Sequence, residues 1–198
     1  MSTVTDQKKE LEIRWHGRGG QGAKTAALLL ADAALSGGKH IQAFPEYGPE
    51  RMGAPVQAYN RISDEQIILH CGITSPDIVA VLDPSLIDVI DITQGVPENG
   101  TIIINTALSA AEIRKKMNIK GRKIYVVNAS KIATDILGKN IPNTPMLGAL
   151  VQVTKLLDKN AFIQDTRKKL EKKFKSKPEI VDGNVKAIQQ AMEEVKSE

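Results

Sequence analysis

The chain has 198 residues, of which 41% are hydrophobic and 25% charged, with 27 Lys and Arg against 23 Asp and Glu. These proportions are typical of a soluble globular protein, and no apolar run approaches the roughly 20 residues that a membrane-spanning helix requires. The polar N-terminal ten residues lack the apolar stretch of a secretory signal, so we expect a cytoplasmic protein with no membrane partner.

The first predicted elements form a strand, a helix and a second strand. Residues 11–15 alternate in polarity and run into a glycine cluster, which predicts a strand that ends in a tight turn. The Ala- and Leu-rich stretch 22–36 predicts a helix buried on most sides, which the pair Gly37-Gly38 ends. Residues 41–44 then predict a short strand. Segment 45–55, with three prolines and two glycines, predicts a long shaped loop.

The next predicted elements are a hairpin and a series of strand–helix units. Residues 56–62 alternate in polarity, and after a turn the stretch 67–69 is expected to return as their antiparallel partner. Three apolar runs follow, and each is predicted to be a strand with a helix after it. The strand at 77–82 precedes a helix that ends near residue 91, the strand at 101–105 precedes a helix at 109–117, and the strand at 123–128 precedes a helix at 130–137. This alternation predicts an α/β fold, a three-layer α/β/α sandwich around a Rossmann-like, mostly parallel sheet with an added antiparallel hairpin.

The C-terminal region is predicted to be helical. We expect one domain over 1–198, with an α/β core at 10–157 and a helical tail at 158–198. In the tail Ile163, Leu170 and Phe174 share one helical face, which leaves the lysine-rich stretch 167–177 on the solvated face and does not favour a nucleic-acid partner. The final segment has an apolar stripe that is expected to pack on the body or on a partner, formed by Val181, Val185, Ile188, Met192 and Val195.

Metal and redox chemistry find little support in the residue types. The single cysteine, Cys71, cannot supply the four thiolates that an iron–sulfur cluster usually takes. The three histidines, His16, His40 and His70, are far apart in sequence and lack the spacing of a zinc site. We therefore expect no metal site in this chain.

The sharpest motif lies at the turn between the first strand and the first helix. It fits the pattern G-x-G-x-x-G and consists of Gly17, Arg18, Gly19, Gly20, Gln21 and Gly22. Glycines at a helix N-terminus expose backbone N–H groups to a diphosphate, so the motif favours a phosphate-bearing ligand. Ordinary NAD binding is disfavoured, because the acid expected at the tip of the second strand is missing and Arg18 is bulky. A tight turn with glycines for packing alone is the alternative.

A family resemblance emerges when this motif is combined with two later stretches. Residues 15–22 and 45–57 together resemble the gamma subunit of pyruvate and 2-oxoacid:ferredoxin oxidoreductases, and residues 143–149 resemble a later stretch of that family. The resemblance extends from about Ile13 to Leu150. The sequence Arg51-Met52-Gly53-Ala54-Pro55 is more similar to the pyruvate branch than to the 2-oxoglutarate branch.

The resemblance implies a role as one subunit of an enzyme complex. That complex converts pyruvate, coenzyme A and oxidised ferredoxin to acetyl-CoA, CO2 and reduced ferredoxin, with thiamine diphosphate, Mg and [4Fe-4S] clusters. This chain has neither a Gly-Asp-Gly thiamine motif nor a Cys-x-x-Cys pair. We therefore expect those groups on alpha, beta and delta partner subunits, and we expect no cofactor bound by this chain alone and no catalytic residue in it.

Two segments are the candidate sites. We expect the loop Gly17–Gly22 to shape the pocket for coenzyme A, with backbone donors from Gly19, Gly20 and Gln21 and charge from Arg18. Packing against a neighbouring subunit is the alternative. We expect the loop 45–55 to form a subunit interface through Glu46, Tyr47, Glu50, Arg51 and Met52, since long ordered loops are usually functional. An ordered surface loop held by ion pairs is the alternative there.

Two other functions compete with the subunit interpretation. A free-standing NAD(P)- or nucleotide-dependent enzyme would need a catalytic acid or base, but the carboxylates are scattered and the histidines have no partner visible in sequence. A basic nucleic-acid-binding module would rest on the lysine-rich tail alone.

Overall fold

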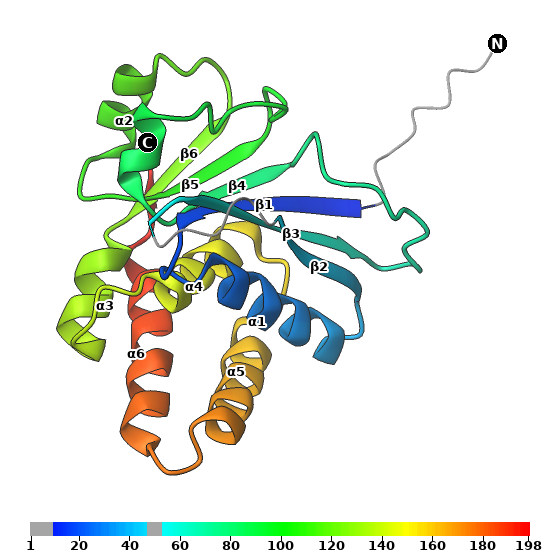
Figure 1. Cartoon of the computed structure of the whole chain (residues 1–198), viewed down its shortest axis with the longest axis vertical. Helices are drawn as coiled ribbons and strands as arrows, with labels where there is room; N and C mark the ends of the chain where they lie inside the picture. Colours follow the sequence, from blue (N-terminus) through cyan, green and yellow to red (C-terminus); the bar gives the residue numbers. More distant parts are fainter. Residues whose placement is uncertain (1–9, 47–52) are drawn as a thin grey trace.

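A mixed seven-stranded sheet with the strand order β2-β3-β1-β4-β5-β6-β7 runs through the part of the chain that the structure describes (Figure 1). The structure is a computed structural model, and it describes residues 10–46 and 53–198. The strands are β1 (Glu10–Arg18), β2 (His40–Glu46), β3 (Pro55–Ser63), β4 (Ile78–Val81), β5 (Thr101–Asn105), β6 (Lys123–Val127) and β7 (Lys196–Ser197). The helices are α1 (Ala23–Ser36), the short 3-10 helix η1 (Pro84–Asp88), α2 (Ala110–Met117), α3 (Ala129–Leu137), α4 (Asn143–Thr154), α5 (Lys159–Lys173) and α6 (Pro178–Glu194).

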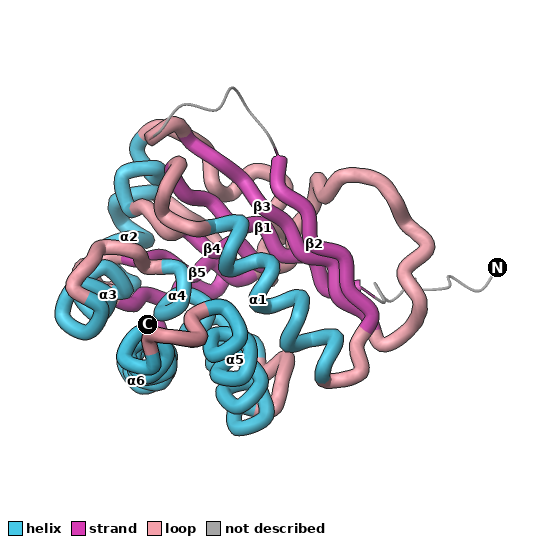
Figure 2. Tube along the Cα trace, turned by 60° about the horizontal axis from the view of Figure 1, so that its bottom comes forward, coloured by secondary structure: helices cyan, strands magenta, loops and turns pink. Residues whose placement is uncertain are grey.

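The centre of the sheet is parallel, as the apolar runs predicted. β1, β4, β5 and β6 are parallel neighbours, and most of their middle residues are buried on both faces, although Tyr125 of β6 is only partly buried. One apolar cluster joins one face of the sheet to α1, α3, α4, α5 and α6, and a smaller cluster joins the other face to η1 and α2. Figure 2 shows α1, α4, α5 and α6 gathered on one side of the strands. The predicted α/β fold with helices on both faces is therefore confirmed.

The predicted hairpin between residues 56–62 and 67–69 is wrong. β3 lies between β1 and β2 and pairs antiparallel with both, so that Trp15 faces Ala58 and Phe44 faces Tyr59. Residues 67–69 form no strand, and the side chains of Ile68 and Leu69 are exposed. Nine residue pairs join β3 to β1, whereas a three-residue partner offers few ladder bonds. The longer, non-local pairing therefore decides where β3 lies.

One helical prediction needs correction, and one helix was not predicted. After Asp83 we expected a helix as far as residue 91, but the structure has only η1, with the Asp83 side chain accepting a hydrogen bond from the Ser85 N–H as its N-cap. Helix α4 had no helical prediction. Its residues 143–151 are all buried, so they show no polar face from which a 3.6-residue period could be recognised.

The C-terminal helices pack against the same face as α1. On α5 the buried side chains are Phe162, Thr166 and Leu170, while Ile163 and Phe174 of the predicted stripe are only partly covered. On α6 four members of the predicted stripe are buried, and the fifth, Val195, follows the last helical residue. Helix α6 packs on α3 and α4, so its apolar face is used within the chain. Within residues 10–46 and 53–198 no helix is long and apolar enough to cross a membrane.

Candidate functional site

The glycine loop lies at the carboxyl edge of the parallel strands, between β1 and α1. β1 continues through Gly17 and Arg18, whose partners on β3 are Val56 and Pro55. Gly20 and Gly22 have φ angles of 94° and 83°, in the left-handed region that glycine adopts without strain. Gly22 is also the N-cap of α1, and no side chain caps that helix. The loop therefore presents the N-terminus of α1 at an edge where α/β folds commonly bind ligands.

The side chain of Gln21 makes one hydrogen bond within this loop and one to Asp83. Its side-chain oxygen accepts a 2.8 Å hydrogen bond from the Arg18 N–H, and its side-chain nitrogen donates to Asp83. The backbone N–H of Gln21 donates to the Arg18 carbonyl at 3.1 Å, and that of Gly19 donates to the Ala54 carbonyl at 3.0 Å. Two of the backbone donors that we assigned to a ligand from the sequence are thus engaged within the chain.

The Arg18 side chain also has partners within the chain. Its guanidinium donates to the Ser85 hydroxyl at 2.9 Å and to the Gly53 carbonyl at 3.0 Å, and lies 3.5 Å from an Asp83 carboxylate oxygen. Burial acts to raise the pKa of Asp83, but hydrogen bonds from Ser85 and Gln21 and the charge of Arg18 together hold that pKa below its ordinary value. Asp83 is therefore ionised at neutral pH and balances the Arg18 charge.

A second helix begins beside the loop. A Cβ atom added to Gly22 would lie 2.5 Å from the side-chain nitrogen of Asn143, the first residue of α4. Helix α4, like α1, has no side-chain cap at its N-terminus. Two helix N-termini, each carrying a partial positive charge from the peptide dipoles, therefore adjoin at Gly22.

Sequence reasoning missed three residues of this arrangement. Asp83 and Ser85 follow the predicted strand 77–82, and their position at a strand's carboxyl end was a signal that could have marked them. Asn143 opened the stretch that carried the family resemblance, but nothing local to it indicated contact with Gly22. In the structure Asn143 is almost fully buried, and its side-chain oxygen accepts a hydrogen bond from the Thr144 N–H.

The candidate interface loop is described only at its margins. Tyr47, Glu50, Arg51 and Met52 lie outside the described residues. Glu46 ends β2, is exposed, and accepts a 2.7 Å hydrogen bond from the Tyr59 hydroxyl. Burial together with this contact raises the pKa of Tyr59. Of the five predicted interface residues, Glu46 alone lies within the described residues, where it contacts Tyr59 of β3.

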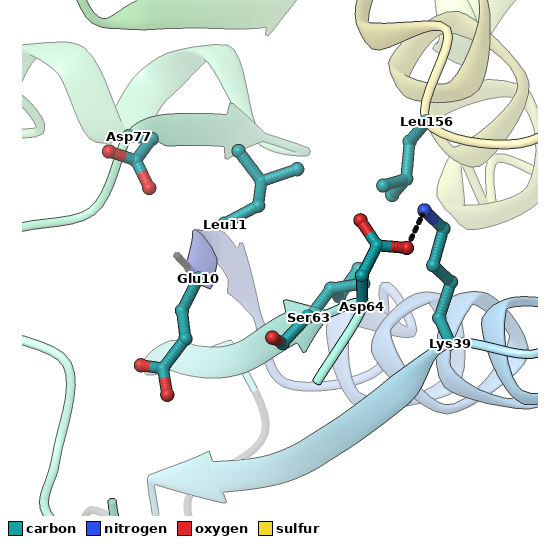
Figure 3. Close-up of a pocket in the computed structure, with 8 residues that line it drawn as sticks. Glu10, Leu11, Lys39, Ser63, Asp64, Asp77 and Leu156 are labelled. Carbon is teal, nitrogen blue, oxygen red and sulfur yellow. Dashed lines mark hydrogen bonds and ion pairs between the residues drawn. The ribbon is translucent and has the colours of Figure 1, made fainter. Parts of the chain in front are cut away.

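A separate hollow of about 370 Å³ lies at the amino end of β1, away from the glycine loop (Figure 3). Lys39 and Asp64 form an ion pair across it, and Figure 3 shows the Glu10 carboxylate pointing away from that pair. Asp77 accepts a 2.8 Å hydrogen bond from the Glu12 N–H. The polar groups of this hollow do not converge on a common point. In the described ranges, no group of three or more His, Cys, Asp or Glu side chains is arranged to hold a metal ion.

Comparison with known proteins assigns the chain to a family. Residues 12–194 match the family model described as pyruvate ferredoxin/flavodoxin oxidoreductase. The chain belongs to this family. The match spans the glycine loop, the loop after β2 and helices α4 to α6, so the family pattern includes the segments that the sequence motifs singled out.

Individual relatives within the family are similar over nearly their whole length. Pyruvate synthase subunit PorC of Thermotoga maritima is 48% identical over 189 residues, which are 96% of each chain. The common gamma subunit of pyruvate/ketoisovalerate oxidoreductases of Thermococcus litoralis is 44% identical over 92% of this chain and 96% of its own. The crystal structure of pyruvate oxidoreductase subunit PORC from Thermotoga maritima has a TM-score of 0.82 and 45% identity, and the match covers 96% of this chain and 99% of that one.

These similarities decide between the interpretations of the sequence. The chain has the role of a gamma subunit in a pyruvate:ferredoxin oxidoreductase, one part of a multi-subunit enzyme. The alternative of a free-standing NAD(P)-dependent enzyme is not supported. The family resemblance drawn from the motifs is confirmed, including the assignment to the pyruvate-oxidising branch.

Proposed function

We propose that this gamma subunit contributes the glycine loop to the coenzyme A pocket of the complex. The observation that carries the proposal is the N-terminus of α1 at Gly22, which no side chain caps and which lies beside the first residue of α4. Coenzyme A carries a diphosphate, and helix N-termini bind such groups through free N–H donors and their dipoles. Thiamine diphosphate, Mg and the [4Fe-4S] clusters belong, in this proposal, to alpha, beta and delta partner subunits, which also pass electrons to ferredoxin.

Arg18 has a specific role in this proposal. In the described structure its charge is balanced by Asp83 and its donors contact Ser85 and the Gly53 carbonyl. A phosphate at the adjoining helix N-termini would compete with Asp83 for the guanidinium, because a phosphate accepts the same paired N–H donors. Arg18 would then turn from Ser85 towards the ligand, and Asp83 would keep its hydrogen bonds from Ser85 and Gln21.

The choice of 2-oxoacid is proposed to lie outside this chain. The relative from Thermococcus litoralis is named as a subunit common to pyruvate and ketoisovalerate oxidoreductases, and it is 44% identical to this chain. A subunit shared by two enzymes does not distinguish their substrates. We infer that the present chain likewise handles what the reactions have in common, of which coenzyme A is one component.

Steady-state kinetics of the reconstituted complex test this proposal. The variant Arg18→Ala is expected to raise the KM for coenzyme A at least about tenfold, the loss of one charged hydrogen-bonding contact, and to leave the KM for pyruvate unchanged. Arg167→Ala, which removes an arginine from the exposed side of α5, is the matched control. An unchanged KM for coenzyme A together with weaker subunit assembly would instead show that the loop packs against a neighbouring subunit.

A further inference from the structure

The positive charge of the chain is concentrated at the far end of the helix pair α5–α6. Seven of the 27 Lys and Arg residues, but only one of the 23 Asp and Glu residues, lie between positions 167 and 177. This stretch therefore carries a formal charge of +6, and the rest of the chain carries −2. Figure 1 shows α5 and α6 running away from the sheet to the turn that joins them. The excess charge thus lies on a projecting part of the subunit.

Most of these basic side chains have no ionic partner. Arg167 is paired with Asp182 at 2.6 Å, and Lys169 with Asp165 at 2.7 Å. The five other side chains are exposed and form no ion pair within residues 10–46 and 53–198. We call this set the basic tip, and it consists of Lys168, Lys172, Lys173, Lys175 and Lys177. The basic tip therefore offers charge that the described chain does not neutralise.

The stability of the subunit does not account for all of these lysines. Lys172 and Lys173 lie in the last turn of α5, where the helix dipole favours a cation. Lys177, in contrast, is the N-cap residue of α6, at the end of a helix where the dipole disfavours a cation. Lys168 and Lys172 are four positions apart on one helix, a spacing at which like charges repel. The basic tip is therefore electrostatically unfavourable in the isolated chain, and an acidic surface would relieve it.

The surroundings of the lysines favour a transient partner. Residues 171–179 are exposed apart from Phe174, which is partly covered and lies 5.5 Å from the Lys173 ammonium. Permanent subunit interfaces have an apolar core from which lysine is depleted. Encounters between electron-transfer proteins bury little surface, and opposite charges on two proteins accelerate their association. The basic tip fits an encounter of this second kind, with a protein that presents an acidic face.

We propose that the basic tip docks an acidic face of the soluble electron carrier that the complex reduces, ferredoxin. Among the reactants of the complex, ferredoxin is the one that is a protein. It must bind and leave in every reaction cycle, so a fast attraction between opposite charges suits it. The tip attracts and orients the carrier beside the partner subunit that reduces it and transfers no electron itself. The basic tip shares no residue with the glycine loop, so this proposal does not depend on coenzyme A binding there.

Steady-state kinetics of the reconstituted complex with ferredoxin as acceptor test the proposal. The test variant combines Lys172→Gln, Lys173→Gln, Lys175→Gln and Lys177→Gln. At about 20 mM salt we expect kcat/KM for ferredoxin to fall at least about fivefold, because steering is lost, and kcat at saturating ferredoxin to stay the same. At about 0.5 M salt the charges are screened, so parent and variant should agree. With methyl viologen, a small dye that needs no docking surface, we expect no difference.

A matched control removes the same number of charges elsewhere. It replaces four exposed lysines that form no ion pair in the described part of the chain, through Lys115→Gln, Lys120→Gln, Lys123→Gln and Lys139→Gln. This variant is expected to lower kcat/KM for ferredoxin by less than about twofold. Equal falls in the two variants would show that only the net charge of the complex matters. That result, or unchanged ferredoxin kinetics in the test variant, overturns the proposal.

Cross-linking of the unaltered complex covers the case in which the test variant does not assemble. A carbodiimide joins a lysine amine to a carboxylate only where the two groups are in contact. We expect ferredoxin to be linked to peptides that contain lysines of the basic tip, and the links to be lost at high salt. Links confined to other lysines overturn the proposal. So does binding of single-stranded RNA that the test variant loses while its ferredoxin kinetics stay normal, because the tip is then a nucleic-acid site.

Discussion

The indole N–H of Trp15 donates a 2.8 Å hydrogen bond to the side-chain oxygen of Asn60, and both residues are fully buried. The Asn60 side-chain nitrogen in turn donates to the Ala27 carbonyl at 2.9 Å. One amide therefore links β1, β3 and α1 in the interior of the apolar cluster. This link explains why an asparagine occupies a fully buried position on β3, and it fixes the position of the strand that our hairpin prediction misplaced.

Replacement of Asn60 by a residue of similar size tests that link. Asn60→Leu removes both hydrogen bonds and leaves the Trp15 N–H buried without an acceptor, so we expect a loss of about 2–4 kcal/mol in the free energy of unfolding. Urea denaturation measures it. Adding Trp15→Phe removes the indole N–H that Asn60→Leu leaves without an acceptor. The loss in the free energy of unfolding of the double variant should therefore be smaller than the sum of the losses of the two single variants. Strict additivity would show that the pair is not coupled.

The close approach of Gly22 to Asn143 predicts a local cost for any side chain at that glycine. Gly22→Ala places a Cβ atom 2.5 Å from the Asn143 side chain and imposes a left-handed φ on alanine. Gly38→Ala is a matched control, because Gly38 has a φ of 80° and its added Cβ would meet nothing within 4 Å. The control should lose about 1–2 kcal/mol from the backbone alone. Thermal melts should show a larger loss for Gly22→Ala, and equal losses would mean that Asn143 moves aside freely.

The sequence correctly predicted those elements whose structure depends on neighbouring residues in the chain. The apolar runs at 77–82, 101–105 and 123–128 became β4, β5 and β6, because strands buried on both faces need apolar residues throughout. The glycine loop was placed between strand and helix, because its left-handed turns at Gly20 and Gly22 require glycine. These features depend on neighbouring residues alone, so one sequence suffices to find them.

Features that depend on distant residues were not predicted. The position of β3 between β1 and β2 follows from nine pairs with a strand about 45 residues earlier, and the Asn60 link is part of that contact. The contact of Asn143 with Gly22, and a cavity that both His16 and Asp91 line, likewise unite segments far apart in the chain. The sequence showed only that His16 lacks the spacing of a zinc site, because the absence of partners for its ring nitrogens among the described residues is visible only in three dimensions.

The lowered pKa of Asp83 predicts an acid-sensitive glycine loop. Burial opposes ionisation, but hydrogen bonds from Ser85 and Gln21 outweigh it, so the folded-state pKa lies below the ordinary value of 3.8. Asp83 therefore contributes stability that is complete above about pH 4 and is lost as the pH falls through its folded-state pKa. Asp83→Asn should flatten the fall in melting temperature below about pH 4. An acid profile identical to that of the parent chain would show that Asp83 is not stabilised in its ionised form.

The interface proposed for the loop after β2 predicts that Arg51 matters for assembly and not for folding. Arg51→Ala should change the free energy of unfolding of the isolated subunit by no more than about 0.5 kcal/mol, as at most surface positions. At an interface the loss of a buried charge pair costs about 2–5 kcal/mol, which would weaken binding to the partner subunits more than tenfold. If the variant has a lower melting temperature than the parent chain but assembles with normal affinity, then Arg51 stabilises the subunit itself and is not an interface residue.

The buried His16 ring predicts that the stability of the isolated subunit falls below about pH 6.5. Its pKa drops from 6.5 to about 3 in the folded chain, first because of burial and then because of Arg14. Between these values the unfolded chain binds a proton that the folded chain does not, so stability rises with pH in this window. The slope is about 1.4 kcal/mol per pH unit, which amounts to a loss of about 2 kcal/mol at pH 5 relative to neutral pH.

Urea denaturation of the isolated subunit between pH 5 and pH 8 measures this slope. His16→Leu should remove most of the dependence between pH 5 and 6.5, because leucine binds no proton in either state. His40→Leu, at an exposed histidine, should retain it. If His16→Leu keeps the full slope, another group supplies the pH dependence, and the imidazole is reached by water or protonated in the folded chain.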